Sequence, residues 1–231
     1  MRGGHERLWL GFRTLVALID SGVSNPPRLS GYPQAMEGAM DARTYFLMLH
    51  EEAHFTGKAR RVFEIPTPEQ WRAVLPGHNS VAWCVWHIAY GEDWGIATLR
   101  GDETLMRRDG WEARLGFAWP TFGIQMTADE AAQVGAAIDL DALRDYYRAV
   151  YEETRRFAQD FDFDTLDTPL QPEVYDHALD LLGGDEFMRT FLKPWTAPRD
   201  YLNIMALMDV YYHFDEADHM VRMLRPEQQF T

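Results

Sequence analysis

Hydrophobic side chains recur every three to four residues over long segments of this chain, which is the spacing of amphipathic helices. The predicted helices cover residues 41–61, 81–100, 127–161, 173–191 and 200–224. Residues that cap or end helices bound them: Asp41, Asn79 or Ser80, and Thr127 at starts, and Pro66, Gly101 and Pro226 after ends. Long connections join the helices, and no strand pattern is sustained. These features predict an all-α, four-helix bundle.

Residues 1–39 differ from the rest of the chain. They contain Gly3-Gly4 and Asn25-Pro26-Pro27, and Met36 and Met40 both precede the first clean helical pattern. We therefore predict a helical-bundle domain over residues 40–231. The segment before it is expected to be a poorly ordered, loosely attached extension or the product of a start codon assigned too early.

Two of the predicted helices carry different patterns. Residues 81–100 are apolar almost all round, with Trp83, Trp86 and Trp94 among them, and a helix without a polar face lies inside a structure. Residues 200–224 are amphipathic. On an α-helical wheel their apolar stripe consists of Ile204, Met205, Met208, Tyr211, Tyr212 and Met223.

Asp215 and His219 fall in the middle of that stripe, four residues apart, so their side chains stack on adjacent turns. A buried carboxylate and a buried imidazole each need a partner. A divalent metal ion held by both is one solution, and a hydrogen bond between them at the wet end of the bundle is the other. His213 and Glu216 fall in other sectors of the wheel, where solvated or rim positions are expected.

A metal site on the last helix needs at least one more ligand from elsewhere. His87 is the candidate, because it lies mid-helix among the most apolar residues of the chain. A core histidine can also be satisfied by a hydrogen bond alone, and spacing does not separate the two interpretations.

The segment PGHNSVAWCVWHIA, from Pro76 to Ala89, resembles the second helix of the DinB-like superfamily, and the likeness extends over about residues 40–225. The resemblance implies an up-down-down-up four-helix bundle. In that family a histidine on the second helix and two ligands at i, i+4 on the last helix bind one metal ion. Matched to this chain, the ligands are His87, Asp215 and His219. Asp215 stands where most members have histidine, although the mycothiol-dependent maleylpyruvate isomerases have a carboxylate there.

The resemblance also implies a class of chemistry. Characterised relatives include isomerases and S-transferases that use low-molecular-weight thiols such as mycothiol or bacillithiol. Three protein ligands leave coordination positions open, and an incoming thiol binds there as thiolate. We therefore expect a thiol-dependent transferase or isomerase for a small electrophilic molecule, with Zn²⁺, Ni²⁺, Mn²⁺ or Fe²⁺ as the metal. The alternative is a non-enzymatic metal-binding or dimerising bundle.

A competing motif occurs in the first predicted helix. His50-Glu51-Glu52-Ala53-His54 matches H-E-x-x-H, in which two histidines bind Zn²⁺ and the glutamate activates water in a zincin-type metallopeptidase. The longer form of the motif, H-E-x-x-H-x-x-G-x-x-H, requires a third ligand at position 60. That residue is Arg60, whose guanidinium cannot ligate a metal. A solvated polar face explains the same residues, and a secondary contribution of His50 or His54 to the bundle site is a third interpretation.

Composition limits which binding partners and which cellular compartment we expect for this protein. The chain has 231 residues and a formal net charge of −14, so nucleic acid is not an expected partner. No segment is apolar enough to span a membrane, and Arg13 interrupts the only stretch that resembles a signal peptide. The single cysteine, Cys84, fits a reducing compartment. We predict a cytoplasmic protein with a small-molecule substrate, and a homodimer is a further hypothesis.

Overall fold

The computed structural model describes residues 40–119, 121–184 and 186–225, and the extension predicted for residues 1–39 lies outside these ranges. The described residues form helices and no strands, which confirms the all-α prediction. In chain order the elements are α2 (Ala42–Phe55), α3 (Gly57–Glu64), α4 (Pro68–Arg72), α5 (Val81–Arg100), α6 (Leu105–Arg108), α7 (Trp111–Leu115), α8 (Ala128–Ala137), α9 (Leu140–Asp160), the 3₁₀-helix η1 (Phe163–Thr165), α10 (Pro172–Leu181), α11 (Glu186–Leu192), α12 (Pro198–Asn203), the π-helix η2 (Ile204–Met208) and α13 (Asp209–Leu224).

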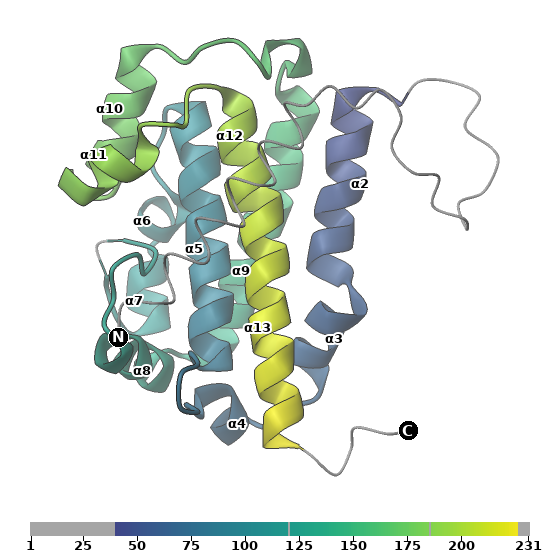
Figure 1. The fold of residues 1–231 in the computed structure, drawn as a ribbon, viewed down its shortest axis with the longest axis vertical. Helices are drawn as coiled ribbons and strands as arrows, with labels where there is room; N and C mark the ends of the chain where they lie inside the picture. The colour runs from purple at the N-terminus through teal and green to yellow at the C-terminus, as the bar shows by residue number, and fades with distance from the viewer. Residues whose placement is uncertain (1–39, 120, 185, 226–231) are drawn as a thin grey trace. The chain divides into compact units, whose positions relative to one another are not determined.

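Four long helical segments form the bundle: α2 with α3, α5, α9, and the continuous run from α12 to α13 (Figure 1). Side-chain contacts fix their directions. Two pairs of neighbouring helices run parallel, because the residue numbers on both partners rise together along the contact. They are α5 with α9, which meet at Asp93–Tyr146 and Arg100–Glu153. The other pair is α3 with α13, which meet at Lys58–Asp215 and Arg61–Asp218. Antiparallel neighbours are α2 with α9, through Arg43–Phe161, and α5 with α13, through Asn79–Glu216 and His87–Asp209. The topology is therefore up-down-down-up.

Local capping explains where the helices begin and where two predicted helices divide. The side chains of Asp41, Ser80 and Thr127 accept hydrogen bonds from backbone amides three residues ahead. Thr56 caps α3 in the same way and interrupts the helix predicted over 41–61. Asp139 caps α9, which separates it from α8. Each division is thus built on a polar side chain that competes with helix continuation.

The second long helix is surrounded by protein along nearly its whole length. Residues 81–98 of α5 are all buried, as the pattern predicted, and α5 packs against α9 and α13. Its aromatic side chains pack on rings from other elements, such as Trp86 on Phe117 and Trp94 on Tyr201. Every polar side chain on this helix must therefore find its partner inside the protein.

The last helix contains an irregularity that the sequence pattern did not reveal. Between α12 and α13 the chain forms a π-helix, in which the amide of Asp209 donates to the carbonyl of Ile204. A π-turn holds one residue more than an α-turn. Each residue after it therefore occupies the position on the helix surface that a regular α-helix would give to the residue before it. The face predicted for Asp215 and His219 consequently carries Glu216 and Met220, and the prediction that Asp215 and His219 point inward is wrong.

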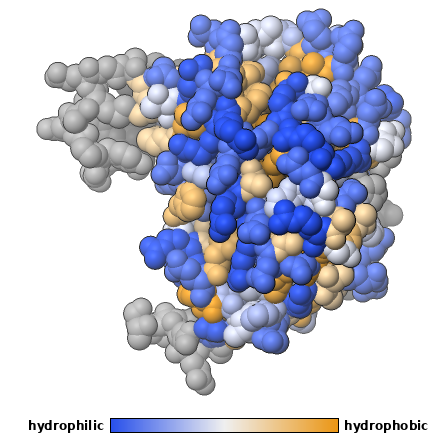
Figure 2. Space-filling view, turned by 180° about the vertical axis from the view of Figure 1, so that it is seen from behind, coloured by the Kyte–Doolittle hydropathy of each residue, from blue (hydrophilic) through white to orange (hydrophobic). Residues whose placement is uncertain are grey.

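Hydrophilic side chains cover most of the face seen from behind, with hydrophobic ones scattered among them (Figure 2). The large hydrophobic side chains that are exposed come from several elements: Tyr45, Met48, Phe55, Val74, Phe187, Tyr211, Tyr212 and Met223. Among the described helices, none combines the length and the apolar character that crossing a bilayer requires.

Asp93 links α5 to two neighbouring elements from a fully enclosed position. Its carboxylate accepts hydrogen bonds from the amides of Leu105 and Met106, at 2.8 and 2.9 Å, and from the Tyr146 hydroxyl at 2.7 Å. Burial raises the pKa of Asp93 to about 6, although these hydrogen bonds oppose the rise. The three donors hold the start of α6 and the middle of α9 against α5.

We expect Tyr146→Phe to lower the free energy of unfolding by about 1.5–3 kcal/mol near neutral pH, because the buried carboxylate of Asp93 loses a donor. Urea denaturation measures this. Tyr45→Phe, at an exposed tyrosine, is the control and should change stability by less than about 0.5 kcal/mol. Equal effects of the two substitutions would contradict the role given to the Tyr146 hydroxyl.

Candidate metal centre

His87 faces α13 with a fixed ring orientation. Its Nδ1 is hydrogen-bonded to the backbone carbonyl of Phe122, and the indole of Trp83 stacks on its ring at 4.6 Å. A carbonyl only accepts hydrogen bonds, so Nδ1 carries the hydrogen and the neutral ring keeps a lone pair on Nε2. That nitrogen lies 3.4 Å from Oδ2 of Asp209. The loop and the tryptophan thus fix the ring so that Nε2 could ligate a metal ion.

His213 presents a second imidazole to the same carboxylate. Its Nδ1 lies 2.9 Å from Oε2 of Glu216, and its Nε2 lies 3.6 Å from Oδ1 of Asp209. Glu216 in turn accepts hydrogen bonds from the backbone amide and the side-chain amide of Asn79. Glu216 therefore fixes the His213 ring through Nδ1, an arrangement that ligating histidines commonly have.

Asp209 lies between the two imidazoles at the start of α13. Its Oδ2 is buried and has no hydrogen-bond partner among the described residues. Ligand atoms of His87, Asp209 and His213 all lie within 4.8 Å of one another. Two ligands bound tetrahedrally to Zn²⁺ at about 2.0–2.1 Å are roughly 3.3 Å apart, close to the two separations found here. A metal ion would supply the partner that Oδ2 lacks.

The electrostatics of the cluster favour a carboxylate beside imidazoles. Burial alone would raise the pKa of Asp209, but the charges of His87 and His213 outweigh it and lower that pKa. Burial would lower the pKa of His213, but Asp209 and Glu216 outweigh it and raise that pKa. Asp209 and His213 therefore stabilise each other's charged forms, and a divalent cation would take the place of the proton between them.

Cys84 lies beside this cluster on α5. Its sulfur is within 4.8 Å of ligand atoms of His213 and Glu216, so it could join a metal site there. Complete burial, reinforced by the negative charge of Glu216, raises the pKa of the Cys84 thiol. Without a metal it is therefore a protonated core residue, as predicted.

The structure does not bring Asp215 and His219 to His87. Asp215 is exposed and pairs with Lys58, and His219 is exposed and packs its ring on His78. The inward pair at the same spacing is Asp209 and His213. The prediction that His213 is a solvated or rim residue is therefore wrong, whereas Glu216 is partly exposed and lies at the rim of a cleft. The sequence contained a signal for this, because Asp209 and His213 show the same D-x-x-x-H pattern six residues earlier.

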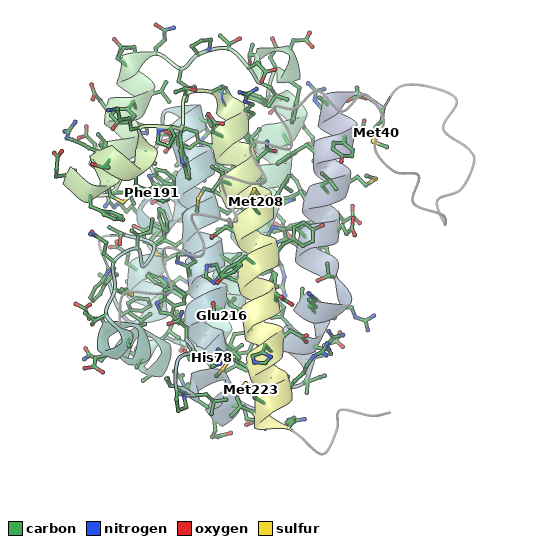
Figure 3. All side chains as sticks on the ribbon, viewed as in Figure 1. Met40, His78, Phe191, Met208, Glu216 and Met223 are labelled. Carbon is green, nitrogen blue, oxygen red and sulfur yellow. The ribbon has the colours of Figure 1, made fainter. Side chains whose placement is uncertain are left out.

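Asp215 and His219 instead border an open cleft beside the cluster. The cleft has a volume of about 620 Å³. Its lining consists of Lys58, Gly77, His78, Tyr212, Asp215, Glu216, Asp218, His219 and Arg222. His78, from the segment that precedes α5, lies near the part of α13 that carries Glu216 (Figure 3). Glu216 belongs to both features, since it touches His213 on one side and lines the cleft on the other.

A second group of metal-ligand side chains lies elsewhere in the bundle. His50 and His54 of α2 meet Glu92 of α5, with exposed fractions of 0%, 2% and 0%. Burial would raise the pKa of Glu92, but His54 and His50 outweigh it and hold that pKa well below its usual range. This buried His/His/Glu triad has the geometry to bind a metal ion. The interpretation of His50 and His54 as a solvated face is therefore wrong.

The triad does not support peptidase chemistry. Glu51, the general base of an H-E-x-x-H motif, has a 62% exposed side chain and pairs with Arg155 on the protein surface. The three residues that could hold a metal are enclosed, which leaves no room for a peptide and a water molecule. The motif is thus a pair of inward histidines on a helix whose glutamate points outward.

The sequence profile of the DinB superfamily matches residues 55–208, two thirds of the chain. The chain belongs to the DinB superfamily. The match includes His87 and ends one residue before Asp209, so family membership alone does not decide the ligands on α13. No curated protein matches this sequence.

A solved structure shares this fold. A conserved protein from Enterococcus faecalis is 19% identical and superposes with a TM-score of 0.61, covering 80% of this chain and 98% of that one. At this identity the likeness concerns the fold alone. It covers nearly all of the smaller protein, so the bundle is shared and the additional length belongs to this chain.

Gly123 lets the loop that binds His87 approach α5. It has φ +100°, and a Cβ there would lie 2.9 Å from Trp83, 3.0 Å from Trp86 and 3.3 Å from His87. We expect Gly123→Ala to destabilise the protein by about 1–3 kcal/mol more than Gly77→Ala. Gly77 is the matched control, because its φ of +83° is also positive but a Cβ would meet nothing within 4 Å. Urea denaturation of both variants checks this, and equal losses would contradict it.

Proposed function

We propose that His87, Asp209 and His213 hold one divalent metal ion, which the protein uses for thiol-dependent transfer or isomerisation of a small electrophilic molecule. One observation carries this proposal. Both imidazoles are held by their Nδ1 atoms, so both Nε2 atoms face the partly exposed carboxylate of Asp209, whose buried Oδ2 has no hydrogen-bond partner among the described residues. Two imidazoles and one carboxylate suit Zn²⁺, Fe²⁺, Mn²⁺ or Ni²⁺.

When bound, such a metal supplies Lewis acidity and lowers the pKa of a thiol that joins it. The protein's own residues provide the setting. The carbonyl of Phe122 and the carboxylate of Glu216 keep the two imidazoles in the tautomer that offers Nε2. Three ligands leave coordination positions for the thiol co-substrate. We assign this chemistry to the cytoplasm, where low-molecular-weight thiols stay reduced.

The neighbouring cleft fits a small polar substrate. Its volume of about 620 Å³ is in the range of small-molecule sites, and charged side chains of both signs line it, including Lys58, Asp215 and Asp218. A substrate there would lie beside Glu216, which contacts His213. The alternative, a non-enzymatic metal-binding bundle, needs the same three ligands but no reaction in this cleft.

Elemental analysis of protein purified without a polyhistidine tag tests the ligand set. His213→Ala should lose one metal ion per chain relative to the wild type, because a two-ligand site holds a divalent ion weakly. His219→Ala should lose none, because His219 is exposed and directed to the cleft. The reverse result would support the ligand pair expected from the sequence, Asp215 and His219.

Cobalt substitution and turnover test the thiol chemistry. In a Cys84→Ala background, which removes the only protein thiol, adding bacillithiol or mycothiol to the Co²⁺-loaded protein should produce a thiolate-to-cobalt charge-transfer band. The same thiol should react faster with monobromobimane, forming a thioether and releasing bromide, than in the His213→Ala variant. A cobalt site that binds no thiol, with no rate enhancement, would favour the non-enzymatic bundle.

A further inference from the structure

The enclosed triad of His50, His54 and Glu92 lies apart from the proposed active centre. His87 and Glu92 are both on α5, five residues apart. Five residues of α-helix rotate by roughly 140° and advance by about 7.5 Å, so the two side chains leave α5 in different directions. His87 faces α13, whereas Glu92 faces α2. The triad is therefore a separate feature of the bundle.

Hydrogen bonding does not account for all the polar atoms of the triad. Nε2 of His50 is bonded to Oε1 of Glu92 at 2.7 Å. Nε2 of His54 lies 3.0 Å from Oε2 of Glu92, yet both atoms are buried and neither has a hydrogen-bond partner among the described residues. Buried polar atoms without a hydrogen bond are costly in a dry interior. The pair is one imidazole nitrogen facing one carboxylate oxygen at ion-pair distance without a hydrogen bond, and both atoms are of the kind that ligates a cation.

The surroundings hold both imidazoles in place for such a group. Nδ1 of His54 lies 2.6 Å from the hydroxyl of Tyr147, so the ring is anchored at the nitrogen away from Glu92. The ring of His50 is stacked on Tyr151 at 5.1 Å and on Phe46 at 5.7 Å. Neither ring can turn without displacing these neighbours. The triad is thus preorganised, as ligands of a bound cation are.

We propose that His50, His54 and Glu92 bind a second divalent cation, of the Zn²⁺ class, in a closed site that ties α2 to α5. This goes beyond the proposed function, because it concerns a different site and no reaction. Two imidazole nitrogens and both oxygens of Glu92 provide four donors without water, which is the coordination number of structural zinc. The cation also neutralises the buried carboxylate, and His50 exchanges its hydrogen bond to Oε1 for a metal bond.

Metal stoichiometry separates the two sites. Protein without a polyhistidine tag is loaded with Zn²⁺, dialysed and analysed for metal. We expect about two ions per chain in the wild type and about one in the double variant His87→Ala/His213→Ala, in which the triad is intact. Adding Glu92→Gln to that background should remove the remaining ion. Glu51→Gln is the matched control on the exposed side of the same motif and should retain it.

A second measurement keeps the proposal testable if the Glu92 variant does not fold. The His87→Ala/His213→Ala protein, with native circular dichroism, is loaded with Co²⁺, and its visible absorption reports the coordination. Intense d–d bands of tetrahedral cobalt, together with a raised Tm, would support the closed site. Absence of bands and of metal would overturn it and leave the triad as a hydrogen-bonded cluster.

The outcomes also separate this proposal from the proposed function. One ion in the wild type and none in His87→Ala/His213→Ala would overturn the closed site and support the active centre. One ion in both proteins would support the closed site and overturn the metal ligands of the proposed function. No ion in either protein would overturn both.

Discussion

The burial of α5 on every side is the constraint on which the rest of the structure depends. Residues 81–98 are all buried, so the polar side chains of this helix cannot reach water. Three of them each meet a different neighbour. His87 meets the loop at Phe122 and the start of α13, Glu92 meets α2, and Asp93 meets α6 and α9. Three side chains of one helix therefore specify where the surrounding elements lie.

The features that the sequence predicted correctly are those determined by local pattern. The burial of α5 follows from an apolar circumference, and its start and end follow from Ser80 and Gly101. The DinB-like bundle followed from one helix motif and is confirmed by the family profile and by the fold. His87 was singled out for its polar side chain in an apolar helix, and that conflict is visible without knowing its neighbours.

What the sequence did not predict depends on contacts between distant segments. His50 and His54 share α2 with the exposed Glu51, and composition alone does not tell which side of the helix is covered. Glu92 and Tyr147, far along the chain, decide it. The face of α13 was misjudged for a different reason, because a regular wheel assumes that every turn of the helix is an α-turn.

The π-helix at Ile204–Met208 has a consequence for comparing this protein with its relatives. The matched profile ends at Met208, the last residue of that π-helix. A turn with one additional residue is equivalent to an insertion inside a helix, and the segments on either side keep their orientation. Aligning this helix with that of a relative whose last helix contains only α-turns therefore requires a one-residue gap within the helix. Without that gap, the metal-ligand positions of one protein would be aligned with residues one position away from the corresponding ones in the other.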